Sequence, residues 1–84
     1  MIERLEKVLR KVVLPMSEGI LDVEINVLGR NDIYRITYLV KDDVEFELLE
    51  DMERETATLF AMLSPKENEK CVVNYKLIEE GLDD

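Results

Sequence analysis

Acidic side chains between positions 42 and 55 are the feature of this sequence that could most readily do chemistry. Carboxylate oxygens are the ligands that Mg²⁺ and Ca²⁺ prefer, and two carboxyls can share acid–base work when an apolar pocket separates their pKa values. The segment lacks the Asp-x-Asp-x-Asp-Gly spacing of a calcium loop, and no pair of its carboxyls is isolated among apolar residues. We therefore expect a solvated acidic surface. Arg54 is its only opposing charge, and the carboxylates are Asp42, Asp43, Glu45, Glu47, Glu50, Asp51, Glu53 and Glu55.

Other catalytic groups are scarce. The chain has no histidine, which excludes a Ser-His-Asp or Cys-His arrangement, a histidine-containing zinc site and an imidazole base. Cys71 is the single cysteine, and its position on the apolar side of an expected strand predicts an unreactive thiol. Gly19, Gly29 and Gly81 are isolated, so no phosphate-binding loop is indicated. We predict no catalytic, cofactor-binding or metal-binding residue, no cofactor and no enzyme activity.

The charge balance narrows the choice of partner. Twenty acidic and 11 basic residues give a formal net charge of −9, which repels phosphate backbones and anionic membrane surfaces and favours a basic protein partner. Tyr34, Tyr38 and Tyr75 could stack on bases, but without a basic groove we expect them in the core or at an interface. We predict no direct nucleic-acid binding.

Composition favours a folded, cytoplasmic protein. The 84 residues are 46% apolar and 37% charged, enough for one domain over residues 1–84 but with a small core. One cysteine excludes an internal disulfide, which fits a reducing compartment. The N-terminus mixes charge signs and the longest apolar run covers only residues 59–63, so neither a signal peptide nor a membrane span is expected. Abundant Glu, Lys and Arg without Gln or His is typical of thermophilic proteins.

Periodicity predicts the first elements. Apolar residues recur at helical spacing over residues 2–13, and Pro15 ends this helix. Residues 21–27 alternate strictly, as a strand with one buried face does. A turn over residues 29–32 and a second alternating run over 33–40 complete a β-hairpin.

The next segment has two interpretations. In a helix that began at Val44, Glu45 would lie in the middle of the apolar stripe, whereas from Leu48 onward no charge does. We therefore predict a third strand over residues 44–48 and a helix over residues 49–63, and then a strand over 71–77 before an acidic tail, 79–84, that frays. The order is αβββαβ, an α+β fold with two helices on one face of a small mixed or antiparallel sheet. If residues 44–63 are all helical, the order is αββαβ, which is ferredoxin-like without its first strand and leaves a gap that a second chain could fill.

Apolar residues on the other face of the sheet predict a homodimer. Two helices cover one face only, and six apolar residues fall out of phase with the face they cover. Each would forgo roughly 1.5 to 3 kcal/mol if exposed rather than buried, although some apolar exposure is ordinary on any surface. They are Ile20, Leu28, Ile33, Leu39, Val72 and Ile78.

Three functions stay open at this point. The first is a non-enzymatic, homodimeric interaction module whose acidic surface binds a basic partner. The second is an acidic mimic of nucleic acid that occupies a nucleic-acid-binding protein, which requires regularly spaced carboxylates. The third, a divalent-cation enzyme, requires a pocket in which carboxylates converge, with Asp42, Asp43, Glu45 and Glu47 as its only candidates.

Overall fold

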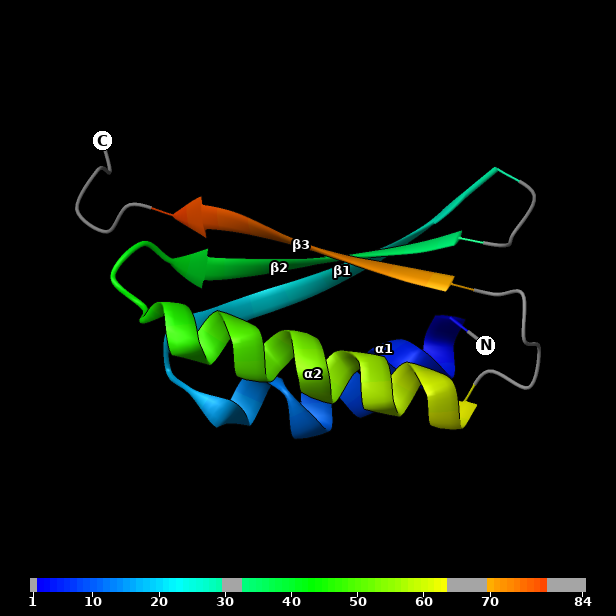
Figure 1. The fold of residues 1–84 in the computed structure, drawn as a ribbon, viewed down its shortest axis with the longest axis horizontal. Helices are drawn as coiled ribbons and strands as arrows, with labels where there is room; N and C mark the ends of the chain where they lie inside the picture. The colour runs from blue at the N-terminus through cyan, green and yellow to red at the C-terminus, as the bar shows by residue number, and fades with distance from the viewer. Residues whose placement is uncertain (1, 30–32, 64–69, 79–84) are drawn as a thin grey trace.

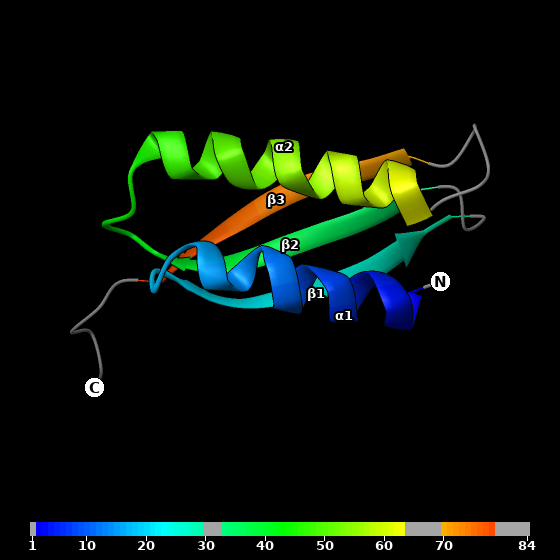
Figure 2. The ribbon, with the colours of Figure 1, turned by 90° about the horizontal axis from the view of Figure 1, so that it is seen from below.

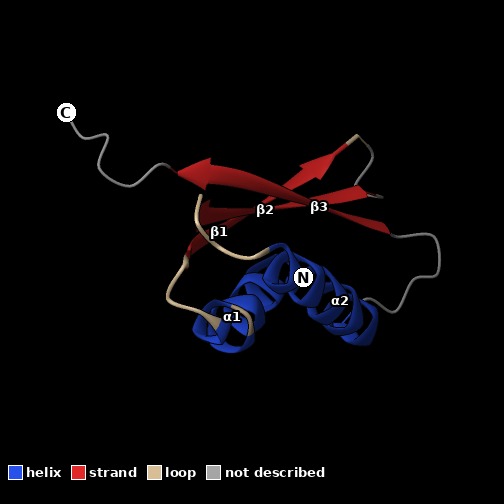
Figure 3. Ribbon diagram, turned by 60° about the vertical axis from the view of Figure 1, so that its left-hand side comes forward, coloured by secondary structure: helices blue, strands red, loops and turns tan. Residues whose placement is uncertain are grey.

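The chain forms two layers, a three-stranded sheet and two helices that lie against one of its faces (Figure 1, Figure 3). The computed structural model describes residues 2–29, 33–63 and 70–78. The αββαβ order is the alternative predicted from sequence. Its elements are α1 (Ile2–Val12), a 3-10 turn η1 (Leu14–Met16), β1 (Ile20–Leu28), β2 (Ile33–Lys41), α2 (Phe46–Leu63) and β3 (Lys70–Ile78).

Helix α1 confirms the predicted amphipathic helix. Leu5 and Leu9 are fully buried on its apolar side, while Arg10 and Lys11 lie in the last turn, where positive charge interacts favourably with the helix dipole. Pro15 does not simply end the helix, because the chain continues as the 3-10 turn η1 with proline in its first turn.

Strands β1 and β2 form the predicted hairpin, antiparallel with Val23 opposite Tyr38 and Val27 opposite Tyr34. Gly29 follows β1 with φ of 65°, a left-handed conformation that glycine adopts without steric cost. The rest of the predicted turn, residues 30–32, lies outside the described residues.

The predicted strand over residues 44–48 is wrong. Residues 42–45 form a turn, and α2 begins at Phe46, with the Leu48 amide donating to the Glu45 carbonyl over 3.0 Å. Glu45 precedes the helix, so its charge does not lie in the apolar stripe. A charge within that stripe was the argument against a helix over residues 44–63. The alternation over residues 44–48 was too short to identify a strand.

The expected gap in the sheet is also absent. β3 pairs directly with β2 in parallel, with Ile36 opposite Val73 and Tyr38 opposite Tyr75, and the strand order is β1-β2-β3. Helix α2 is thus the crossover of a compact βαβ unit. A second chain is not needed to complete this sheet. The polar connection over residues 64–69 and the acidic tail over 79–84 lie outside the described residues.

The core lies between the helices and the inner face of the sheet. Figure 2 shows α1 along β1 and α2 along β3, with β2 between them. The inner side chains of β2 are buried accordingly, with Ile36, Tyr38 and Val40 at 0% exposure. Within the described residues, no helix is long and apolar enough to cross a membrane.

One shift of register changes the predicted faces at the start of β1. Pairing is irregular between Ile20 and Asp22, so Ile20 is buried at 6% exposure whereas Leu21 is 45% exposed. The prediction that Ile20 lies on the outer face with the other five apolar residues is therefore wrong. A bulge of this kind moves one residue from one face of a strand to the other.

Candidate functional site

The face of the sheet that the helices leave uncovered, hereafter the outer face, combines apolar side chains with charge. Val72, Ile33 and Ile78 are 45%, 39% and 36% exposed, and Leu28 and Leu39 are half-buried. By alternation and register, the polar and charged side chains on this face are Asp22, Glu24 and Asn26 of β1, Arg35, Thr37 and Lys41 of β2, and Lys70, Asn74 and Lys76 of β3.

Charge on the outer face is ordered by strand. β1 contributes the two acids of the face, Asp22 and Glu24, whereas β3 contributes Lys70 and Lys76, and β2 adds two more basic residues. The outer face is therefore net basic in a chain whose formal net charge is −9. Its acidic and basic columns lie on opposite edges of the sheet, an arrangement that can match a rotated copy of itself.

The open edge of β1 is covered by side chains. Asp22 Oδ1 accepts from the Val23 amide over 2.8 Å, and Arg10 Nη2 donates to the Val23 carbonyl over 3.3 Å. Arg10 is held in place by Asp22 at 2.8 Å and Glu6 at 3.0 Å. These residues line a pocket of about 340 Å³ that continues onto the outer face at Lys76. The arrangement occupies the backbone groups of Val23, which a strand added at this edge would otherwise pair.

This contact was not predictable from local patterns, because Arg10 and Asp22 are 12 residues apart and belong to different elements. The only signal in the sequence was Arg10, a charged residue in the last turn of an amphipathic helix that precedes β1.

The acidic segment does not form a metal site in the described part of the chain. Asp42, Asp43 and Glu45 lie in the turn before α2, and the other carboxylates are on α2, whose exposed side they share with Arg54. Across residues 2–29, 33–63 and 70–78, no three Asp, Glu or Cys side chains gather closely enough to hold a metal ion. The predicted solvated surface agrees with this arrangement.

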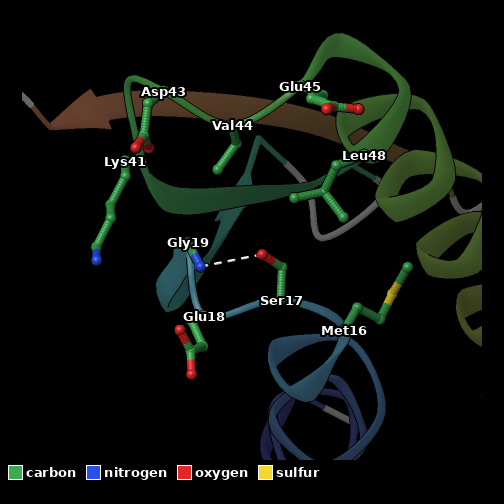
Figure 4. Close-up of a pocket in the computed structure, with 9 residues that line it drawn as sticks. All are labelled: Met16, Ser17, Glu18, Gly19, Lys41, Asp43, Val44, Glu45 and Leu48. Atoms are coloured by element: carbon green, nitrogen blue, oxygen red, sulfur yellow. Dashed lines mark hydrogen bonds between the residues drawn. The ribbon is translucent and has the colours of Figure 1, made fainter.

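A second pocket, of about 490 Å³, lies where the turn before β1 meets the turn before α2. Figure 4 shows Glu18, Asp43 and Glu45 at separate points around it, with Val44 and Leu48 between the two turns. The backbone is fixed there, since the Gly19 amide donates to Ser17 Oγ over 3.0 Å. The carboxylates do not converge, and convergence is what the divalent-cation hypothesis required of Asp43 and Glu45.

The tyrosines lie on the inner face, as expected for core residues. Tyr38 is fully buried, and its hydroxyl is 2.5 Å from Thr56 Oγ1 on α2; burial raises the pKa of Tyr38 to about 12. The Tyr75 hydroxyl donates to the Leu49 carbonyl over 2.7 Å, and burial, together with Glu53, raises its pKa to about 12. Tyr34 packs edge-on against Phe60, with ring centroids 5.3 Å apart. None of the three offers a free ring to a base.

Cys71 lies on the inner side of β3 and is half-buried. Burial raises the pKa of its thiol, a bond to its own backbone offsets part of this rise, and the Glu53 carboxylate raises the pKa further. The net rise in pKa disfavours the thiolate, which is the reactive form.

Comparison with known proteins identifies a fold but no family. No family model and no curated protein matches the sequence. A similar solved structure is that of CzrB, described as a candidate zinc transporter, with a TM-score of 0.67 and 14% identity over 92% of each chain. Another is the CTD of the magnetosome protein MamB from Desulfamplus magnetovallimortis BW-1, with a TM-score of 0.62 and 21% identity over 93% of this chain and 90% of that one. At these identities the likeness concerns the fold alone.

Proposed function

We propose that this chain is a non-enzymatic interaction module that acts in the cytoplasm as a homodimer and binds a basic partner. The observation that carries the dimer is the outer face, where Val72 and Ile33 are 45% and 39% exposed on a sheet whose two edge strands carry opposite charges. Apolar groups bordered by complementary charge are the usual make-up of a specific interface.

Fold similarity supports an accessory role. CzrB is described as a candidate zinc transporter and the MamB fragment as the CTD of a magnetosome protein, and neither description names an enzyme. By analogy at the level of fold, we propose that the present chain serves a metal-transport system as a non-catalytic partner domain.

Charge also suggests how two copies would pack. A two-fold axis that runs along the strands, between two facing sheets, places β1 of one copy over β3 of the other. Asp22, which is level with Lys76 across the sheet, then faces Lys76 of the second copy, and Glu24 lies opposite Asn74, next to that lysine. Arg35 on the central strand would meet its own equivalent, so its charge opposes this packing while the outer columns favour it.

Light scattering tests the dimer. The wild-type chain should give about twice the 9.8 kDa chain mass across a tenfold range of concentration. Ile33→Lys combined with Val72→Lys places two charges in the proposed interface and should give monomers. Met62→Lys is the matched control, because Met62 is 75% exposed on α2, away from the outer face, and should leave the mass unchanged. A wild-type protein of monomer mass throughout would remove the homodimer.

The other two functions gain less support. A nucleic-acid mimic needs carboxylates in a row, yet those on α2, from Glu47 to Glu55, spread around more than half of the helix at about 100° per residue. A divalent-cation enzyme needs carboxylates that converge in a pocket, and those lining the larger pocket lie apart.

A further inference from the structure

The free edge of the sheet at β3 exposes backbone hydrogen-bonding groups. The Asp42 amide donates to the Ile78 carbonyl over 3.0 Å, so the even-numbered residues of β3 turn their backbone groups toward β2. In a strand, alternate residues point these groups in opposite directions. Those of Cys71, Val73, Tyr75 and Leu77 therefore point away from the sheet. Within the described residues, the Cys71 thiol bonds to its own backbone, and no side chain of another residue bonds to these groups.

Helix α2 runs beside this edge and makes its surroundings acidic. The bond between the Tyr75 hydroxyl and the Leu49 carbonyl holds the helix against the strand. Glu53 lies close enough to raise the pKa of both Cys71 and Tyr75, and Glu50 is exposed one turn before it.

Exposed apolar side chains lie at one end of the β3 edge. Phe46, which begins α2, is 71% exposed, and Leu77, near the end of β3, is 57% exposed. The start of α2 and the end of β3 lie at the same end of the molecule (Figure 1). The edge thus combines unpaired backbone groups, acids and apolar contact area.

We propose that β3 binds an extended peptide segment as a fourth strand, and that this segment carries basic residues at alternate positions. The proposal rests on the proposed function, in which the chain binds a basic partner, and it locates that binding site at the β3 edge. Backbone hydrogen bonds would supply affinity, as in other cases of strand addition. Basic side chains on the inner side of the added strand would face Glu50 and Glu53.

The outer side of the added strand requires a different residue type. There it would lie beside Val72, between Lys70 and Lys76, so apolar or acidic side chains suit it and further basic ones do not. Alternation, rather than basic charge alone, is therefore the recognition rule.

A second copy of β3 fits this edge less well than a basic segment. Antiparallel pairing of two β3 strands about Asn74 would bring the α2 helices of both copies together, with Glu50 and Glu53 of each close to those of the other. Like charges brought together oppose association, and each chain already has a net charge of −9.

The test uses the full chain labelled with ¹⁵N and a peptide of alternating lysine and valine, beginning and ending with lysine. On binding, amide hydrogen exchange should slow several-fold at Cys71, Val73 and Tyr75, whose amides the new strand would pair. Exchange at Val72 and Asn74 should not change, because their amides already face β2. Slowed exchange at both sets, or at neither, would overturn the proposal.

Two control peptides test the recognition rule. A peptide of the same composition with its lysines in one block, and one with proline at the centre, should each bind roughly tenfold more weakly, since one loses alternation and the other a backbone donor. Equal affinity for all three would overturn strand addition while leaving a general preference for basic partners intact.

Charge reversal in the protein completes the test. Glu50→Lys combined with Glu53→Lys should weaken the alternating peptide at least tenfold. Glu3→Lys combined with Glu18→Lys makes the same change in net charge at exposed positions away from β3 and should leave the slowed exchange at Cys71, Val73 and Tyr75 in place. If these amides are already slow without peptide and become faster on dilution, the edge is occupied by a second copy and the proposal fails.

Discussion

The two edges of the sheet are built in opposite ways. At β1, the Val23 amide and carbonyl are bonded by Asp22 and Arg10, and α1 buries Leu5 and Leu9 completely. At β3, Val73 and Tyr75 are half-buried and Leu77 is 57% exposed. Within the described residues, the β1 edge is therefore closed by side chains at Val23, whereas the β3 edge is free of bonds from other residues.

The difference arises from what each helix places beside its strand. Helix α1 carries a long basic side chain, Arg10, in its last turn, and this side chain donates to the backbone of β1 at Val23. Helix α2 places Glu53 close to Cys71 and Tyr75 of β3, with Glu50 one turn before it, and carboxylates have no donor groups for strand carbonyls. Stability is therefore expected to concentrate in the α1–β1 half, and recognition in the α2–β3 half, where local opening costs less.

The largest expected effect compares the cores of the two halves. Leu9→Ala should lower the free energy of unfolding by about 2 to 5 kcal/mol, because Leu9 is fully buried and its removal leaves a cavity. Val73→Ala should cost only about 1 kcal/mol, since this side chain is half-buried and its site stays open to water. Urea denaturation at one protein concentration measures both. Equal losses would contradict a division into closed and open halves.

The second effect concerns the contact between Gly19, just before β1, and Val44, in the turn before α2. A Cβ at Gly19 would collide with Val44 Cγ1, so Gly19→Ala should cost about 1 to 3 kcal/mol through overpacking. Val44→Ala in the same chain should restore much of the loss. Gly29→Ala is the control for backbone strain alone, because its Cβ would meet nothing within 4 Å although φ is 65°. Without rescue by Val44→Ala, this steric explanation would be wrong.

The third effect contrasts the two tyrosine hydroxyls. Tyr38→Phe leaves Thr56 Oγ1 buried without its partner and should cost about 1 to 3 kcal/mol. Tyr75→Phe should cost about 0.5 to 1 kcal/mol, because the Leu49 carbonyl is part-buried and belongs to a helix that supplies its own donor. Adding Thr56→Val to Tyr38→Phe removes both polar groups and should recover stability in thermal or urea unfolding. A larger cost at Tyr75 would reverse the comparison.

Much of the fold could be predicted because its signals are local. The helical spacing of Leu5 and Leu9 predicted α1, and alternation predicted β1, β2 and β3 within one or two residues. Residues 44–48 misled because a short apolar alternation is compatible with a strand and with the start of a helix. The structure resolves the ambiguity by beginning α2 after Glu45, a boundary that no periodicity marks.

Pairing between elements was beyond local patterns. Alternation places Tyr38 and Tyr75 on buried faces, but it does not say that their strands are neighbours, and the αββαβ alternative was expected to leave a gap in the sheet. Ile20 is buried because the register shifts between Ile20 and Asp22, and strict alternation cannot predict such a shift. The interaction surfaces differ in the same way. Alternation along the strands predicted the apolar residues of the outer face, but it could not predict that β1 and β3 form the two edges of the sheet, because that depends on strand order.

The smallest expected effect on stability falls on the feature that distinguishes the edges. Arg10→Ala removes two exposed ion pairs, with Glu6 and Asp22, and should cost only about 0.2 to 1 kcal/mol. Its larger consequence is local, because the Val23 carbonyl loses its donor and Asp22 loses the charge that holds it against the Val23 amide. Hydrogen exchange should therefore become several-fold faster at Val23 and stay unchanged at Val73. Arg10→Lys keeps the charge without the planar fork of donors and should restore the rate only in part. Unchanged exchange at Val23 in Arg10→Ala would mean that the β1 edge is closed by its own twist rather than by this side chain.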